Sequence, residues 1–130
     1  MVLESIFFLG AIHDLIEEAT TIRYFREVIY VKEPTIEEKI VAKASSAGVD
    51  PQLATSIAWC ESNYIPTAKN PNSTASGVFQ FVEGTWGDYC EGDVFDEDAN
   101  IQCAIDLLSE GGEMHWKASM PCWSKLALNQ

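Results

Sequence analysis

Basic residues are scarce in this 130-residue chain, which has 8 lysines and arginines against 20 aspartates and glutamates. The formal net charge is −12 and the isoelectric point is near 4.3. Because nucleic-acid binding relies on Lys and Arg side chains that neutralise phosphates, this balance argues against a nucleic-acid partner. It also argues against a cationic, bactericidal protein that is drawn to anionic cell surfaces. The simplest interpretation of the many acids is a solvated, acidic surface.

A hydrophobic run long enough to cross a membrane is also lacking. The apolar stretch at residues 6–12 is too short for a stable membrane span. It resembles the middle of a signal peptide, but no Lys or Arg precedes it. The alternative is an amphipathic helix that packs on the domain or on a partner, with the apolar side chains Phe8, Ile12, Leu15 and Ile16. We therefore leave residues 1–34 open between a leader and a docking segment.

Closely spaced cysteines are absent as well. The four cysteines, Cys60, Cys90, Cys103 and Cys122, form no Cys-x-x-Cys motif. Neither a metal site nor a redox motif is therefore predicted. An even count in a small chain fits two disulfides in an oxidising compartment, and three pairings are possible. The alternative is four buried free thiols in a cytosolic protein.

The globular part of the chain begins near Pro34. With 47% hydrophobic residues, the chain is long enough for one domain and an additional segment. Thr35 and Glu38 have the spacing of a capping box at the start of a helix, and Gly48 is typical of its end. One face of this helix is apolar, with Ile36, Ile40, Ala44 and Ala47. We expect it to form a wall behind the helix that follows.

A single acid continues the apolar face of the second predicted helix. Asp50 and Pro51 are typical of a helix start. Leu53, Ile57 and Glu61 lie four residues apart and therefore share one helical face. Partial burial and the negative end of the helix dipole both act to raise the pKa of Glu61, as general-acid chemistry requires. The alternative is an ordinary solvated glutamate at a helix end.

Three ordered motifs carry a resemblance to a known family. They are Cys-Glu-Ser at residues 60–62, Gly-Val-Phe-Gln-Phe at 77–81 and Gly-Thr-Trp at 84–86. Their order and spacing resemble the catalytic core of the lysozyme-like superfamily, in particular the lytic transglycosylases and the resuscitation-promoting factors. The resemblance covers about residues 36–123. It departs from the transglycosylases at Phe79, where they usually have Met, and it lacks their later Tyr-Asn-x-Gly motif.

The resemblance implies a lysozyme-like fold of the α+β class, predominantly helical, with a two-lobed substrate cleft. Residues 35–123 are then the catalytic domain, and residues 124–130 are a C-terminal tail. The resuscitation-promoting factors join the Cys before their Glu to a C-terminal Cys. Carried over to this chain, that implies the disulfides Cys60–Cys122 and Cys90–Cys103.

The resemblance also assigns roles to site residues. It implies that Glu61 is the catalytic acid and that Gln80, Thr85 and Asn100 contact the substrate. Tyr64, which follows the acid closely, is a further candidate for contact with a sugar.

The function implied is cleavage of the bond between N-acetylmuramic acid and N-acetylglucosamine in peptidoglycan. We expect a monomer that needs no cofactor and acts on glycan strands outside the cell or in the cell envelope. The acids Glu83, Asp88 and Asp93 match no family position for a second carboxylate, which favours one Glu acting as acid and base. The alternatives are a hydrolytic lysozyme or muramidase, and a non-catalytic module of the same fold that binds the cell wall.

The second half of the chain has two further features for which we predict structural roles. The acidic stretch at residues 91–98 continues into a pattern that lacks the glycine and the closing glutamate of a calcium loop. We therefore expect Asp98 to cap the next helix. His115, beside a tryptophan and without a second ligand nearby, is predicted to be structural.

Overall fold

The computed structural model describes residues 12–20 and 32–128. It divides the chain into two units, residues 1–33 and 34–130, and each is described by itself. In the first unit residues 12–20 are helical, with Ile12, Leu15 and Ile16 exposed. Phe8 and most of the apolar stretch at residues 6–12 lie outside the described residues. The role of this unit as a leader or a docking segment therefore stays a prediction.

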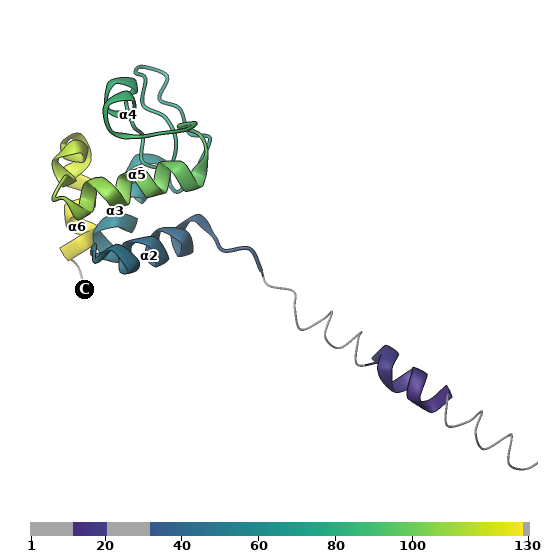
Figure 1. Ribbon diagram of the computed structural model, residues 1–130. Helices are drawn as coiled ribbons and strands as arrows, with labels where there is room; N and C mark the ends of the chain where they lie inside the picture. The colour runs from purple at the N-terminus through teal and green to yellow at the C-terminus, as the bar shows by residue number, and fades with distance from the viewer. Residues whose placement is uncertain (1–11, 21–31, 129–130) are drawn as a thin grey trace, which may run out of the picture. The chain divides into compact units, whose positions relative to one another are not determined.

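The second unit is built from helices joined by loops (Figure 1). In chain order they are α2 (Ile36–Ala47), α3 (Pro51–Ser62), α4 (Glu83–Tyr89), α5 (Glu97–Ser109), the 3-10 helix η1 (Glu113–Ser119) and α6 (Met120–Leu128). Within the described residues, β structure is limited to two isolated bridges, which pair Ser76 with Lys69 and with Phe81. The prediction of a predominantly helical protein is thus confirmed, whereas the two-lobed cleft stays a prediction.

Local sequence signals set most of the helix ends. Thr35 and Glu38 form the predicted capping box at the start of α2, and Gly48 ends this helix in a left-handed conformation with φ of 70°. Asp50 caps α3 by accepting a hydrogen bond from the backbone of Gln52. The prediction for α5 was wrong by two residues. Asp96, not Asp98, is the cap, because its carboxylate accepts from the backbone N–H of Ala99.

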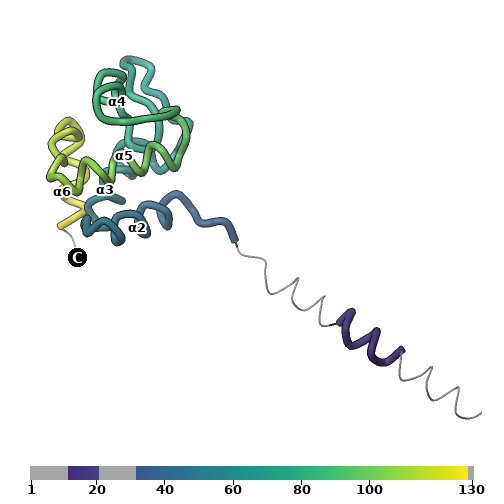
Figure 2. The backbone as a smooth tube through the Cα atoms, viewed as in Figure 1, coloured from purple at the N-terminus to yellow at the C-terminus, as the bar shows by residue number. Residues whose placement is uncertain are grey.

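Helix α3 lies at the centre of the domain, where it packs against α2 and α6, while α2 also packs against α5. The residues of the core with no exposed surface are Ile40, Ala44, Ala54, Ile57, Ala58, Val78, Phe79, Ile101, Ala104 and Ile105. Figure 2 lets the chain be followed from the end of α3 through the long connection at residues 63–82 to α4. This connection contributes Val78 and Phe79 to the core, so it is a packed part of the domain.

The C-terminal residues continue a helix. Residues 124–128, predicted as part of a tail, belong to α6, which runs to Leu128. The side-chain amide of Gln52 on α3 donates to the backbone carbonyl of Leu126, at 3.3 Å. The end of α6 is therefore tied to α3 by a hydrogen bond, while the side chains of Leu126 and Leu128 stay exposed.

Candidate active site

Glu61 lies in the last turn of α3, one turn after the buried Ile57. The helix ends at Asn63, whose left-handed backbone (φ 53°) turns the chain away from the helix axis. The Glu61 side chain is partly buried, and this burial raises the pKa of its carboxyl above the usual value. A hydrogen bond with Ser119 acts in the opposite direction and lowers it.

Ser119 is the hydrogen-bond partner of the Glu61 carboxyl. Its Oγ lies 2.5 Å from Oε1 of Glu61 and 3.1 Å from the backbone carbonyl oxygen of Trp116. A serine hydroxyl carries one proton and a carbonyl oxygen can only accept. When the Ser119 proton points to Trp116, the short contact with Glu61 therefore needs the proton of a neutral carboxyl. When Glu61 is ionised, the Ser119 proton turns to the carboxylate.

When the Ser119 proton turns to Glu61, the carbonyl of Trp116 still has a hydrogen-bond partner. It also accepts from the indole N–H of Trp123, at 3.0 Å.

A disulfide holds the segments of Glu61 and Ser119 together. Cys60, which precedes Glu61, is bonded to Cys122, which follows Ser119 by three residues. The structure contains this pair and Cys90–Cys103, the same two pairs that the resemblance implies.

A tight turn at Gly77–Gln80 faces the end of α3. Ser76 and Phe81 close it with two reciprocal backbone hydrogen bonds of 3.0 Å. Gly77 has φ of 80°, and a Cβ atom there would lie 2.2 Å from Nδ2 of Asn100. The position therefore admits only glycine, for both backbone and packing reasons.

Three side chains from distant parts of the chain hold this turn. Ser62, the residue after Glu61, donates to the carbonyl of Val78 at 2.7 Å. Trp116 donates its indole N–H to the carbonyl of Phe79 at 2.8 Å. Asn100 accepts from the backbone N–H of Phe79 at 2.9 Å. The serine of the Cys-Glu-Ser motif thus fixes the turn against the helix that carries the acid.

Asn100 corrects one prediction. Its side chain has no exposed surface, and besides accepting from Phe79 it donates to the carbonyl of Val94 at 2.8 Å. It therefore cannot contact a substrate in this structure. Its role is to position the turn, because a buried amide with satisfied hydrogen bonds fixes the backbone groups around it.

Gln80 is the turn residue that lines the same pocket as Glu61. Its backbone is left-handed, with φ of 52°, an uncommon conformation for a residue with a side chain. Its amide nitrogen donates to the carbonyls of Gly77 at 2.9 Å and Ala68 at 3.1 Å. This fixes the side chain and leaves its oxygen Oε1 as an acceptor.

Glu61 and Gln80 line one pocket of about 430 Å³, which we call the Glu61 pocket. Its lining residues are Trp59, Cys60, Glu61, Ser62, Asn63, Ala68, Lys69, Asn70, Pro71 and Gln80. Glu61 is the only carboxylate among them, and Lys69 is the only cation. The acids Glu83, Asp88 and Asp93 are not among the lining residues, so Glu61 is the one carboxyl that lines this pocket.

Two other predicted contact residues lie elsewhere. Tyr64 lines a neighbouring pocket together with Trp59, and Thr85 on α4 lines neither of these pockets. Trp86 is held in place by its indole N–H, which donates to the carbonyl of Gly92 at 3.1 Å, and by its ring, which packs edge-on against Phe81. The substrate contact predicted for Thr85 stays a prediction.

Comparison with known families adds to this geometry. The family model of the transglycosylase SLT domain matches residues 38–117, which is more than half of the chain and includes Glu61 and Gln80. The chain belongs to this family. The SLT domain family comprises lytic transglycosylases that cleave peptidoglycan, as the resemblance predicts. Comparison with curated proteins and with solved structures finds no match to this chain.

The described residues were also compared with what a metal site and a membrane span require. Residues 12–20 and 32–128 contain no group of three or more His, Cys, Asp or Glu side chains that could hold a metal ion. None of the helices in these ranges is both long enough and apolar enough to cross a membrane.

Sequence reasoning missed Ser119. The residue lies two positions beyond the end of the family match and belongs to none of the ordered motifs. The one available signal was the implied Cys60–Cys122 bond, which brings the segment around residue 119 close to Glu61. A disulfide restricts a neighbourhood of several residues, and it does not identify the one that bonds to the acid.

Proposed function

We propose that this SLT domain cleaves the bond between N-acetylmuramic acid and N-acetylglucosamine, with Glu61 as both acid and base. The observation that carries the proposal is a single, partly buried carboxyl in a pocket shared with Gln80. Because burial raises the pKa of Glu61, the carboxyl keeps its proton to higher pH than an exposed acid. It can then donate that proton to the glycosidic oxygen as the bond breaks.

The reaction we propose is non-hydrolytic. Glycosidases of the usual kind need a second carboxylate as base or nucleophile, and the residues lining the Glu61 pocket include no second acid. The acetamide group of the substrate takes the place of that carboxylate by stabilising the cation at the reacting carbon. Glu61, now ionised, accepts the proton of the sugar's own hydroxyl, which bonds to this carbon and closes a 1,6-anhydro ring. Proximity of that hydroxyl favours this route over attack by water.

Ser119 assists both halves of this cycle. While Glu61 is neutral, the hydroxyl of Ser119 can accept from it and donate to the carbonyl of Trp116. After Glu61 has given up its proton, the same hydroxyl can donate to the carboxylate and stabilise it. The positions of heavy atoms need not change between the two states.

Digestion of peptidoglycan in heavy-oxygen water tests the reaction type. We expect released fragments with 1,6-anhydro ends, lighter by one water than reducing ends and free of label in mass spectra. Label in most fragment ends identifies water as the nucleophile and makes the chain a muramidase. A digest with the Glu61→Gln variant is the matched control, since it should release about 10²–10⁴-fold fewer fragments. Binding to peptidoglycan with no release by the wild-type chain would instead favour a wall-binding module.

We also propose that the domain works outside the cytoplasm as a monomer, with the catalytic domain running from residue 35 to the end of α6. Two disulfides and a peptidoglycan substrate support this location, because disulfides persist in oxidising compartments.

A further inference from the structure

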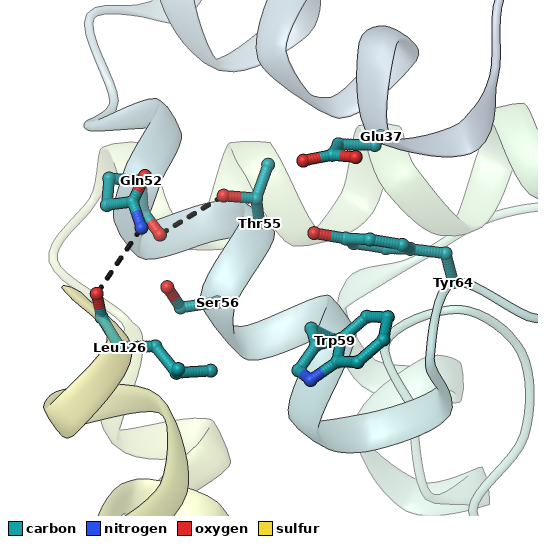
Figure 3. Close-up of a pocket in the computed structure, with 7 residues that line it drawn as sticks. All are labelled: Glu37, Gln52, Thr55, Ser56, Trp59, Tyr64 and Leu126. Atoms are coloured by element: carbon teal, nitrogen blue, oxygen red, sulfur yellow. Dashed lines mark hydrogen bonds between the residues drawn. The ribbon is translucent and has the colours of Figure 1, made fainter.

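A second pocket adjoins the Glu61 pocket, and the two share the side chain of Trp59. It has a volume of about 450 Å³, and we call it the Glu37 pocket. Its walls come from α2, from α3 and the residues after it, and from α6 (Figure 3). The lining residues are Glu37, Gln52, Thr55, Ser56, Trp59, Tyr64 and Leu126.

The Glu37 carboxylate and the Tyr64 phenol oxygen lie near one another in this pocket, whereas the Thr55 hydroxyl is turned toward the carbonyl of Gln52, at 3.2 Å (Figure 3). The Thr55 hydroxyl donates its proton to the carbonyl of Pro51, at 2.8 Å, so its lone pairs are left to accept. Glu37 is exposed and makes no ion pair among the described residues, where both ion pairs belong to Lys39. The Glu37 carboxylate, with the Tyr64 phenol oxygen near it, therefore gives the pocket a charged acceptor.

Positively charged donors are absent from the lining of the Glu37 pocket, since none of its seven residues is Lys, Arg or His. The amide of Gln52 uses one of its two N–H groups on the carbonyl of Leu126. The donors that remain are neutral: the second N–H of Gln52, the Ser56 hydroxyl, the indole of Trp59 and the phenol of Tyr64. A carboxylate with no positively charged residue beside it in the lining is matched by an ammonium group, which has three donors and no acceptor.

Aromatic rings and the local charge favour a cation as well. The Trp59 side chain is 48% exposed, and its ring centroid lies 5.5 Å from that of Tyr64. Faces of such rings attract cations. The pKa of the Tyr64 phenol is raised, first by burial and then by the negative charge of Glu37. The carboxylate of Glu37 therefore acts on the interior of the pocket as well as on solvent.

An unused hydroxyl lies beside this site. Ser56 is 3% exposed, and its Oγ is the one buried side-chain oxygen or nitrogen in the described residues that lacks a hydrogen-bond partner. Figure 3 places this hydroxyl next to Leu126, away from the oxygens of Glu37 and Tyr64. A buried hydroxyl without a partner is unfavourable. A ligand that extends past the ammonium site and moves the Leu126 side chain can supply that partner from a peptide group.

We propose that the Glu37 pocket binds the side-chain ammonium group of the peptide that peptidoglycan carries. The choice of ligand rests on the proposed function, because the amine of a diamino acid in this peptide is a cation of that substrate. The peptide branches from N-acetylmuramic acid, the sugar whose bond is cleaved at Glu61. Because Trp59 lines both pockets, the Glu37 pocket is close enough for this branch to enter while the sugar lies at Glu61.

Binding is tested with Nα-acetyl-lysine methylamide and with the same molecule acetylated on its side-chain amine. In nitrogen–proton correlation spectra of the full chain, we expect the first probe to shift the resonances around Tyr64 and Trp59. The acetylated probe should bind roughly tenfold more weakly or more, the effect of losing one charge-assisted contact. Glu37→Gln should remove this difference, and Glu110→Gln, an equal charge change outside both pockets, should keep it. Equal binding of the two probes by the wild-type chain overturns the proposal.

Ser56→Ala separates use of the hydroxyl from simple burial. If the hydroxyl serves the ligand, the variant binds the probe about fivefold more weakly although its Tm does not fall. Unchanged affinity removes Ser56 from the site.

Digestion of native and acetylated peptidoglycan tests whether the Glu37 pocket binds the amine of the polymer itself. Acetylation of the amines in peptidoglycan should raise KM roughly fivefold or more for the wild-type chain and have no effect on Glu37→Gln. An effect of Glu37→Gln that is equal on both substrates would mean that the pocket holds a sugar, which contradicts the proposal. Absence of cleavage in every digest, with selective probe binding intact, refutes the proposed function and leaves the ammonium site standing.

Discussion

The Glu61 pocket and the Glu37 pocket each contain one carboxylate and share Trp59, yet they place that carboxylate in opposite settings. Glu61 is partly buried at the end of α3, and a serine hydroxyl lies 2.5 Å from it. Glu37 is exposed in the first turn of α2. Burial gives a carboxyl a proton that it can transfer, whereas exposure leaves a fixed charge that attracts a cation. In our two proposals, one residue type thus serves chemistry in one pocket and recognition in its neighbour.

The largest expected effect comes from removing the proton carrier. Glu61→Gln should lower release of fragments from peptidoglycan by about 10²–10⁴-fold, the usual contribution of a general acid. It should leave the fold intact and the binding of the ammonium probe in the Glu37 pocket unchanged. Fragment release and probe titration on the same sample measure both. Release close to that of the wild-type chain would remove Glu61 from the catalytic role.

The Glu61→Gln variant also tests whether the raised pKa of Glu61 makes the stability of the fold depend on pH. Because the pKa of Glu61 is raised by folding, the folded chain holds this proton more tightly than the unfolded chain. The stabilisation is therefore complete below the unfolded pKa and is lost as pH rises through the folded pKa. Glu61→Gln should abolish this part of the pH dependence of unfolding. An unchanged dependence would mean that burial of Glu61 does not perturb its titration.

The next largest effect concerns the disulfide beside the Glu61 pocket, which Cys60 lines. Cys60 stands between Trp59 and Glu61, and its bond to Cys122 spans 62 residues, against 13 for Cys90–Cys103. Replacing Cys60 and Cys122 with alanine should lower the free energy of unfolding by about 4 kcal/mol, and the other pair by about 3 kcal/mol. Denaturant titrations of the two double variants measure this order. Disulfide mapping that links Cys60 to Cys90 or Cys103 would contradict the assignment.

Ser119→Ala is expected to have an intermediate effect, confined to the Glu61 pocket. The Ser119 hydrogen bond lowers the pKa of Glu61, so its loss should raise that pKa. The limb of the pH–rate profile that falls with rising pH should move up by about one unit. Burial and Ser119 are the two causes of the Glu61 shift, and Lys69 is the other charged side chain lining the pocket. A lower rate with an unmoved limb would make Ser119 merely structural.

The smallest effects are expected from residues that only position the substrate. Gln80→Ala should reduce the rate by about tenfold, because the amide fixes the turn and offers an acceptor to the sugar. Thr85→Ala should reduce it less, since Thr85 lines neither pocket. In both variants the limb of the pH profile assigned to Glu61 should stay in place. A rate loss that is larger for Thr85→Ala than for Gln80→Ala would place the substrate over α4.

Predictions based on local signals succeeded where the local signal was strong. The capping box of Thr35 and Glu38, the Asp50 cap and the Gly48 end depend on residues within four positions of one another. The prediction for Asp98 failed because two acids, Asp96 and Asp98, stand near one helix start, and sequence does not say which one accepts the first free backbone N–H. The tail prediction failed because the contact that holds the end of α6, between Gln52 and Leu126, joins residues 74 positions apart in the chain.

The sequence by itself determined where the helices begin, which acid continues an apolar face, and which family the ordered motifs belong to. These depend on spacing along the chain, which a linear pattern carries in full. Only the tertiary structure decided that Asn100 supports the turn from within the core, that Ser119 bonds to Glu61 and that Tyr64 faces Glu37. Each of these pairs is separated by more than 20 residues in the chain and is brought together by packing. The environment that gives a carboxyl its function is made of such pairs.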